Sequence, residues 1–336
     1  MREHASSRWR QIQKLSQHLS DRISLCTLPT PLHKLEELSR RMSRDIWIKR
    51  DDLTGFAMGG NKARKAEFLL ADALRRGSDV ILTAGAMQSN HARTVAAAAR
   101  KVSKECHLFL EGEKPDPPTA NVLLDILAEA HIHPVHVEGE RLSAMDAFAE
   151  ELRKRGRNPY VIPVGGSNEI GSQGYVSGFE ELEKQLRSLP PKPTVLVFCS
   201  SSGGTHAGSL VGKALTGSKV ELLGIRNDDA PRFEECICDV ANALSKKIGI
   251  HRVFQRGEVH LNSDYVGEGY GVPSKEGKSA MKELWQCEGV LLDPVYTAKA
   301  MAGLIDLARR GEWVDERVIF LHTGGIPSVF GLSSPL

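Results

Sequence analysis

Long apolar stretches and an excess of one charge are both missing from this 336-residue sequence. No segment approaches the roughly 18 consecutive apolar residues of a membrane-spanning helix. Residues 1–20 are polar and lack the apolar core of a secretion signal. The formal net charge of +2 gives no reason to expect a nucleic-acid partner. We therefore expect a cytoplasmic protein that acts on small molecules, with no membrane or nucleic acid as a partner.

Cysteine is also sparse. The six cysteines are scattered, and the one close pair, Cys236 and Cys238, is spaced too tightly for a CxxC metal or redox motif. We expect the cysteines to be reduced and structural, and the sequence predicts no metal site.

The composition, with 41% hydrophobic and 26% charged residues, is that of a globular protein, and the length allows two domains of roughly 150 residues each. From Val80 onward, short apolar segments alternate with helical patterns, which indicates parallel sheets with right-handed crossovers. The expected strands are 46–48, 80–83, 107–110, 134–137, 160–163, 194–199, 221–225, 291–292 and 318–321. The expected helices are 35–43, 66–74, 92–102, 120–130, 143–155, 178–189, 206–215, 232–247, 275–286 and 298–309, with weak helical periodicity at 11–19 and a hinge-like stretch of small residues at 165–174.

The run from Gly59 to Lys65 places a lysine, Lys62, where a glycine turn meets the start of a helix. A lysine restrained in this way suits Schiff-base formation. Its amine must approach one carbonyl carbon at a fixed angle and must lose its proton near neutral pH. Lys65, one turn later, would add positive charge beside an anion at the helix N-terminus. Taken alone, the run fits a glycine turn followed by solvated basic residues at least as well.

Two polar loops follow predicted strands, which is where open parallel sheets bind ligands. Residues 88–91 read Gln-Ser-Asn-His, and a helix cap by Ser89 or Asn90 explains them as well as a ligand does. Residues 200–205 read Ser-Ser-Ser-Gly-Gly-Thr and offer hydroxyls and backbone amides to a phosphate at a helix N-terminus. This second loop has neither a Walker A lysine nor a GxGxxG fingerprint, and a flexible turn without a ligand is its alternative.

A third loop, residues 322–325, follows the last predicted strand. The hydroxyl of Thr323 could face the nitrogen of a heteroaromatic ring there, although a glycine turn that ends an edge strand explains the residues too. Tyr270 lies in a glycine turn and Tyr296 follows an Asp-Pro pair. Each tyrosine is equally explained as a packed aromatic with a satisfied hydroxyl.

A restrained lysine, a phosphate loop and a hydroxyl at a third strand end provide partners for the aldehyde, phosphate and ring nitrogen of pyridoxal 5'-phosphate (PLP). On these motifs, together with residues 293–296, the chain from about Leu28 to its C-terminus resembles the family of D-cysteine desulfhydrases and 1-aminocyclopropane-1-carboxylate (ACC) deaminases. The resemblance implies an α/β fold of PLP fold type II, tryptophan-synthase-β-like, with two open twisted parallel-sheet domains that carry helices on both faces. It further implies a smaller inserted domain (64–174), a larger cofactor-binding domain (1–63 and 175–336), an active site between them, and a homodimer.

The same resemblance implies roles for individual residues. Lys62 would carry the cofactor as a Schiff base and would be catalytic, together with Ser89, Tyr270 and Tyr296. The cofactor-binding residues would be Asn61, Lys62, Lys65, Asn90, Ser202, Gly203, Gly204, Thr205 and Thr323. The small amino-acid substrate would contact Ser89, Asn90, His91 and Thr297.

Two positions separate the activities within this family. ACC deaminases have glutamate directly after the tyrosine of the Asp-Pro-Val-Tyr run and leucine after the histidine of the last loop, whereas this chain has Thr297 and Thr323. The resemblance therefore implies a PLP-dependent lyase that eliminates the β-substituent of D-cysteine, or of a related alanine, to give pyruvate, ammonia and sulfide. ACC deaminase, L-cysteate sulfo-lyase and a catalytically silent PLP-binding protein stay as alternatives.

Overall fold

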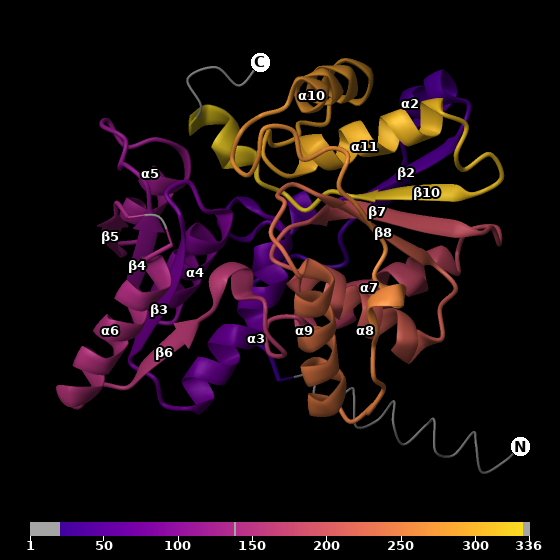
Figure 1. Ribbon diagram of the computed structural model, residues 1–336. Coiled ribbons are helices and arrows are strands. Elements are labelled where there is room, and N and C mark those ends of the chain that lie inside the picture. The colour runs from indigo at the N-terminus through magenta and orange to yellow at the C-terminus, as the bar shows by residue number, and fades with distance from the viewer. Residues whose placement is uncertain (1–20, 138, 332–336) are drawn as a thin grey trace, which may run out of the picture.

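The computed structural model describes residues 21–137 and 139–331 (Figure 1). Two sheets lie side by side, and helices pack on both faces of each. The α/β fold with two parallel-sheet domains expected from the sequence is confirmed. The weak helical pattern at residues 11–19 falls outside the described residues. None of the helices in the described ranges is long and apolar enough to cross a membrane.

The larger sheet has six strands in the order β1-β2-β10-β7-β8-β9, parallel except for β1 against β2. Its strands are β1 (Leu32–Lys34), β2 (Asp45–Lys49), β7 (Thr194–Ser200), β8 (Glu221–Arg226), β9 (Leu261–Asn262) and β10 (Arg317–Leu321). One face is covered by α2 (Glu36–Met42), α10 (Lys275–Glu288) and α11 (Thr297–Arg309), and the other by α7 (Gln173–Leu186), α8 (Gly204–Thr216) and α9 (Phe233–Lys247). Because β7 and β10 are buried on both faces, they read as continuous apolar runs, and β10 is a central strand, not an edge strand.

The smaller sheet has four parallel strands in the order β5-β4-β3-β6. Its strands are β3 (Val80–Ala86), β4 (Glu105–Glu111), β5 (His131–Val135) and β6 (Pro159–Ile162). The helices α3 (Asn61–Arg75), α4 (Asn90–Lys101) and α5 (Ala120–Leu127) pack on one face, and α6 (Arg141–Lys154) packs on the other. Short 3-10 turns lie at Asp51–Leu53, Phe56–Met58, Val164–Gly166, Arg256–Glu258 and Ile326–Gly331.

The predictions for residues 291–292, 178–189 and 134–137 need correction, and the last of these strands lies at His131–Val135. The expected strand at residues 291–292 is wrong, because this segment has no strand pairing and its Leu291 carbonyl instead accepts a hydrogen bond from His322 Nε2 at 2.8 Å. The helix expected at residues 178–189 begins at Gln173, inside the predicted hinge. Gly174 belongs to that helix because a Cβ there would lie 2.4 Å from the Arg64 carbonyl oxygen, so α7 packs backbone to backbone against α3.

Candidate active site

A cavity of about 380 Å³ lies where the carboxyl ends of strands from both sheets meet. Ala86 from β3 and Glu111 from β4 contribute from the smaller sheet. Ser200 from β7, Asp228 after β8 and Thr323 after β10 contribute from the larger one. Because parallel strands direct their carboxyl ends to the same edge, loops far apart in the sequence converge here. All three loops singled out in the sequence line this one cavity, as does the start of α3.

Lys62 is the second residue of α3 and is held by the glycine turn before it. Gly59 and Gly60 have φ values of 71° and 108°, which favour glycine, and a Cβ on Gly60 would lie 2.8 Å from the Thr323 carbonyl oxygen. The backbone amide of Asn61 donates to that same carbonyl at 3.0 Å, so the turn is docked on the last loop. Burial lowers the pKa of Lys62 to about 8, which brings loss of its proton close to neutral pH.

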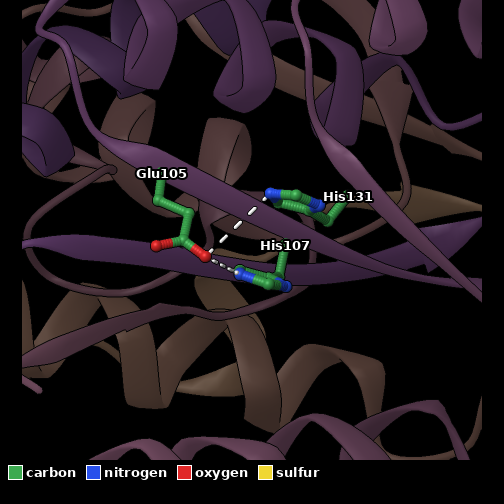
Figure 2. A group of neighbouring side chains, drawn as sticks. All are labelled: Glu105, His107 and His131. Atoms are coloured by element: carbon green, nitrogen blue, oxygen red, sulfur yellow. Dashed lines mark hydrogen bonds and ion pairs between the residues drawn. The ribbon is translucent and has the colours of Figure 1, made fainter.

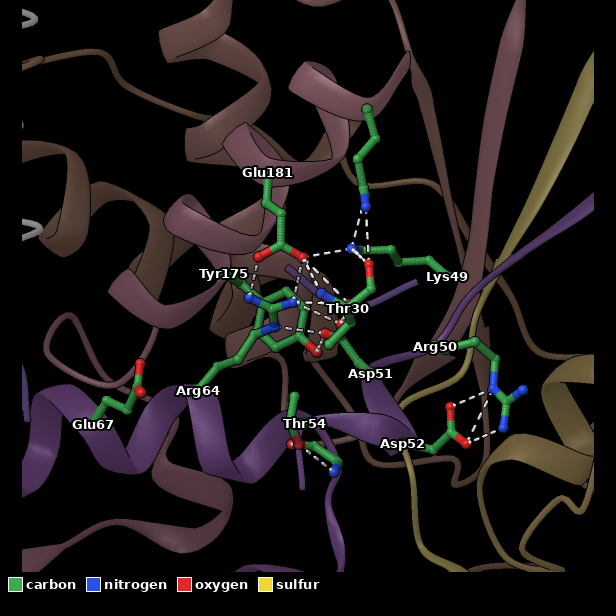
Figure 3. Close-up of polar contacts among 12 residues, drawn as sticks. Thr30, Lys49, Arg50, Asp51, Asp52, Thr54, Arg64, Glu67, Tyr175 and Glu181 are labelled. Atoms are coloured by element: carbon green, nitrogen blue, oxygen red, sulfur yellow. Dashed lines mark hydrogen bonds and ion pairs between the residues drawn. The ribbon is translucent and has the colours of Figure 1, made fainter. Parts of the chain in front are cut away.

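Behind Lys62, a buried ionic network fixes the first turns of α3 (Figure 3). Arg64 Nη2 lies 2.8 Å from Asp51 Oδ1 and 2.9 Å from Glu181 Oε1. Tyr175 donates to Asp51 Oδ2 at 2.7 Å, and Lys49 of β2 donates to Glu181. Arg64 is only 1% exposed, so the alternative of solvated basic residues is wrong here. The network ties α3 to β2 and α7, and it thereby fixes the helix that presents the lysine.

The serine–glycine loop leads into α8 without a side-chain cap. Gly203 is the N-cap residue, with φ of 78°, and it has no side chain to offer the first helical amides. The first of these amides, that of Gly204, donates to Ser167 Oγ at 3.2 Å, whereas those of Thr205 and His206 have no partner within the helix and are available to an anion. Ser202 Oγ accepts a hydrogen bond from Ser167 at 2.9 Å, and Thr205 lines the cavity. The loop thus presents amides and hydroxyls at the positive end of a helix.

Lys65 lies directly behind this loop. Its buried Nζ donates to the Gly165 carbonyl at 3.0 Å and to Ser167 Oγ at 3.2 Å, and both partners are neutral. Burial lowers the pKa of Lys65 well below its usual range, and an anion bound at the loop would restore the charge. A Cβ on Gly204 would lie 2.8 Å from Lys65 Nζ, so the glycine keeps the path between the ammonium and the loop open.

The polar loop after β3 is both a helix cap and part of the cavity wall. Ser89 is the N-cap of α4, and its Oγ accepts the Ala92 amide at 3.1 Å, so the capping interpretation is confirmed. Asn90 Oδ1 accepts from Asn121 Nδ2 at 3.0 Å, and Asn121 also donates to the Gln88 carbonyl at 2.8 Å. These bonds fix the orientation of the Asn90 amide, and its NH2 group is the part that is left for a ligand.

His91 also lines the cavity, but one of its ring nitrogens is engaged with the smaller sheet. Its Nε2 lies 2.9 Å from Thr83 Oγ1, and the Thr83 hydroxyl donates to the Ile162 carbonyl at 2.9 Å. Because that hydroxyl has a single proton, His91 Nε2 must be the donor in their bond. Burial lowers the pKa of His91 well below its usual value, so the ring is neutral.

Tyr270 and Tyr296 meet at the cavity, with their hydroxyl oxygens 2.5 Å apart. Burial raises the pKa of both tyrosines, and more strongly that of Tyr296. Both hydroxyls are therefore protonated at neutral pH. Either hydroxyl can donate within this pair, and the one that does not can give its proton to a bound molecule.

The two threonines that distinguish the activities are placed differently. Thr323 lines the cavity, with 8% of its surface exposed. Thr297 is 0% exposed, and its Oγ1 donates to Asp293 Oδ1 at 2.6 Å while accepting the Asp293 amide at 2.8 Å. The expected substrate contact of Thr297 is thus not made in this arrangement, because its hydroxyl is used to hold the turn before α11. Gly204 and Lys65 also lie outside the cavity wall, directly behind it.

Several cavity residues were not singled out from the sequence. Arg93 lies in an alanine-rich helix, yet it is buried, and its Nη2 donates to the Gly59 carbonyl at 3.3 Å. Arg141 Nη1 lies 3.1 Å from Glu111 Oε2, and both residues line the cavity. Asn121 positions Asn90 from α5. No local motif marks these residues, because each reaches the site through a contact with a distant segment.

A family model described as pyridoxal-phosphate dependent enzyme matches residues 23–324. A D-cysteine desulfhydrase of Klebsiella pneumoniae subsp. pneumoniae is 42% identical over 321 residues, which covers 92% of this chain and 95% of that protein. A putative 1-aminocyclopropane-1-carboxylate deaminase of Pyrococcus abyssi is 40% identical over 312 residues, covering 92% and 93%. A solved structure of an ACC deaminase homologue has a TM-score of 0.87 and 36% identity, covering 95% of this chain and 96% of that one. The chain therefore belongs to the family of pyridoxal-phosphate-dependent enzymes.

Proposed function

We propose that this enzyme is a β-elimination lyase that converts D-cysteine, or a related β-substituted alanine, to pyruvate, ammonia and sulfide. The observation that carries the proposal is that Lys62, whose pKa burial lowers to about 8, and the hydroxyl pair of Tyr270 and Tyr296 line the same cavity. A base for the Cα proton and an acid for the departing sulfur are thus both present. The relatives named D-cysteine desulfhydrase, at 42% identity, support this choice of substrate.

The residues present fit PLP at each of its functional groups. The start of α8, where Gly203 offers no side-chain cap, and the buried amine of Lys65, which donates to two neutral oxygens, suit the phosphate. The Asn90 NH2 group suits the phenolic oxygen, because its Oδ1 is already taken by Asn121. The Thr323 hydroxyl suits the ring nitrogen, and the Lys62 amine suits the aldehyde.

When bound, PLP supplies an electron sink that stabilises negative charge at the substrate Cα. Lys62 then removes the Cα proton, and its lowered pKa leaves a useful fraction of free base near neutral pH. Ser89 and the first amides of α4 suit the substrate carboxylate, because a helix N-terminus favours an anion. One hydroxyl of the Tyr270–Tyr296 pair gives its proton to the leaving sulfur, and the other supports the charge that forms on the first oxygen.

The test is a steady-state assay of the purified holoenzyme with D-cysteine, L-cysteine, ACC and L-cysteate in turn. Sulfide and pyruvate should form fastest from D-cysteine, and Lys62→Ala should abolish turnover and the visible absorbance of the lysine-bound cofactor. Borohydride reduction followed by peptide mapping should place the cofactor on Lys62 in the wild type. A faster reaction with ACC than with every β-substituted alanine tested would overturn the proposal.

ACC deaminase is the second candidate, because the Pyrococcus relative that carries this name is 40% identical. ACC has no Cα hydrogen, so opening its ring demands a different first step from the cofactor. A neutral hydroxyl such as that of Thr323 supports a protonated pyridine ring less well than a carboxylate does. We therefore rank this activity below β-elimination. The homodimer and the cytoplasmic location stay predictions, and light scattering of the purified enzyme tests the first of them.

A further inference from the structure

We propose that Glu105, His107 and His131 form a binding site for a divalent transition-metal ion of the Zn²⁺ class, away from the active site (Figure 2). One ligand atom from each residue lies within 4.8 Å of the others. Imidazole nitrogen and carboxylate oxygen are ligands that Zn²⁺ accepts, and two histidines with one carboxylate leave a coordination position for water. The inference goes beyond the sequence, which predicted no metal site.

Strand pairing brings the three side chains together. His107 of β4 and His131 of β5 are register partners on neighbouring parallel strands. Glu105 lies two residues before His107, so its side chain projects from the same face of the sheet. The pairing of β4 with β5 therefore holds the three side chains together, although the two strands are far apart in the sequence. Cys106 lies between Glu105 and His107 and takes the opposite face, where it packs in the apolar core.

The distances require only a small adjustment around an ion. Glu105 Oε1 is 2.7 Å from His107 Nε2 and 4.0 Å from His131 Nε2, whereas Zn²⁺ bonds to such atoms are about 2.0–2.2 Å long. The rings of the two histidines are stacked, with centroids 4.6 Å apart, so one ring must turn for both nitrogens to face a common point. His131 is the one that can turn, because its side chain is 60% exposed.

A fourth residue supplies the outer partner that metal-bound histidines usually have. His133 Nε2 lies 2.9 Å from His107 Nδ1. A carboxylate oxygen can only accept, so without an ion His107 Nε2 donates to Glu105, and in the neutral ring Nδ1 is then the acceptor toward His133. With an ion on Nε2, the His107 proton moves to Nδ1 and points at His133 Nε2, which then accepts it. Such an outer hydrogen bond fixes the tautomer and orientation of a ligating imidazole.

The orientation of the carboxylate suits a metal ion. Arg157 Nη2 donates to Glu105 Oε2 at 2.7 Å, which leaves Oε1 facing the two histidines. Neutral imidazole and ionised carboxylate are the forms that bind metals.

The position of the site indicates a structural role. Glu105 begins β4, whereas Glu111, which lines the active-site cavity, ends the same strand. An ion here would join β4 to β5, which is the outer strand of the smaller sheet. We therefore expect Zn²⁺ to stabilise this sheet and to leave the turnover of the holoenzyme unchanged.

The test is equilibrium dialysis of tag-free holoenzyme against Zn²⁺, with metal analysis and thermal unfolding. The wild type should bind one ion with a raised Tm, and His131→Ala, at an exposed position that folding tolerates, should lose both. His133→Phe, which keeps an aromatic ring stacked on Phe109, should weaken binding about 10- to 100-fold because the outer partner is gone. His251→Ala, at an exposed histidine remote from the group, is the matched control and should bind as the wild type does.

Zinc X-ray absorption of the wild type identifies the ligands directly. Imidazole nitrogen and carboxylate oxygen should surround the ion, without sulfur. Three results would overturn the proposal: no zinc bound by the wild type, equal affinity in His131→Ala, or cysteine sulfur among the ligands. A fall in sulfide production on adding Zn²⁺ that persists in His131→Ala would indicate inhibition elsewhere, and would not support the site.

Discussion

The side-chain amide of Asn61, the residue before Lys62, donates to Thr205 Oγ1 at 3.0 Å. The lysine-bearing helix and the loop at residues 200–205, the proposed phosphate site, are therefore joined directly. Loss of one neutral hydrogen bond is worth about 1 kcal/mol, so Asn61→Ala should weaken PLP binding about fivefold. The affinity for PLP is measured by dialysis, with the absorbance of the bound cofactor as the readout. Thr205→Ala should weaken PLP binding by a similar factor. Because both single variants remove the same hydrogen bond, the double variant should bind PLP about as weakly as either single variant does. Strictly additive losses would show that the two side chains act independently.

Gly204 should tolerate no side chain, although its backbone conformation would allow one. A Cβ there would lie 2.6 Å from Ser167 Oγ and 2.8 Å from Lys65 Nζ, so Gly204→Ala must displace groups that surround the proposed phosphate site. We expect strongly reduced cofactor retention with a nearly normal unfolding midpoint. Gly257→Ala, where nothing lies within 4 Å of the new Cβ, is the matched control. Equal cofactor retention in the two variants would mean that the phosphate lies elsewhere.

The ionic network behind α3 should contribute strongly to stability. Arg64→Leu leaves Asp51 and Glu181 buried with one cation fewer, and removing one partner of a buried ion pair typically costs about 3–5 kcal/mol. Urea unfolding should show this loss as a lower midpoint. Glu37→Ala, which breaks the exposed pair with Arg40, is the control and should leave the midpoint almost unchanged. A small effect of Arg64→Leu would mean that water or repacking replaces the network.

Capture of PLP by the cofactor-free enzyme should depend on pH through Lys62. Burial disfavours the charged amine, so the pKa falls to about 8, and the reactive free amine gains population as the pH rises through that value. At pH 7, about a tenth of such amines are unprotonated, against about one in 3,000 for an ordinary lysine. The rate of cofactor capture, followed by visible absorbance, should therefore rise up to about pH 8 and then level off. A rate that climbs about tenfold per pH unit beyond pH 9 would contradict the lowered pKa.

Much of the fold could be predicted because its helices carry clear periodicity and its buried strands are continuous apolar runs. The errors occur where tertiary contacts decide. Gly174 looks like a hinge residue, but it lies inside α7 because only a glycine fits against the Arg64 backbone. β5 was expected at residues 134–137 and lies at His131–Val135, since its polar histidines hide the strand from an apolar pattern. Leu291 and Leu292 resemble a strand in the sequence because they are apolar and at least partly buried. They form no strand because no neighbouring strand pairs with them.

The candidate site was predictable to the extent that it is built from loops at strand ends. Lys62, the loop at 200–205 and Thr323 all have local signals, namely glycines, hydroxyls and a preceding apolar strand. Arg93 and Asn121 have none, because they act on Gly59 and Asn90 across the fold. Lys65 is an intermediate case. Its place one turn after Lys62 predicts a role beside a bound anion, but only the structure shows that its side chain is completely buried.

The two threonines that distinguish this chain from ACC deaminases should act through different mechanisms. Thr323 lines the cavity, so Thr323→Leu removes a hydroxyl from the ring nitrogen's side and should lower D-cysteine turnover about tenfold, as expected when a bound polar group loses its hydrogen-bond partner. Thr297 is buried against Asp293, whose carboxylate accepts the backbone amides of residues 295, 296 and 297.

Thr297→Glu would therefore break the hydroxyl bonds to Asp293 and place a second carboxylate beside it, where burial already raises the Asp293 pKa. We expect a lower unfolding midpoint from this change, and a shift toward ACC only when it is combined with Thr323→Leu. Steady-state rates with D-cysteine and ACC, together with unfolding midpoints, are to be compared for the wild type, both single variants and the double variant. An unchanged midpoint in Thr297→Glu would show that the new side chain points into the cavity, as the substrate contact implied by the family resemblance requires. In that case both positions would border the cofactor ring and set its protonation together.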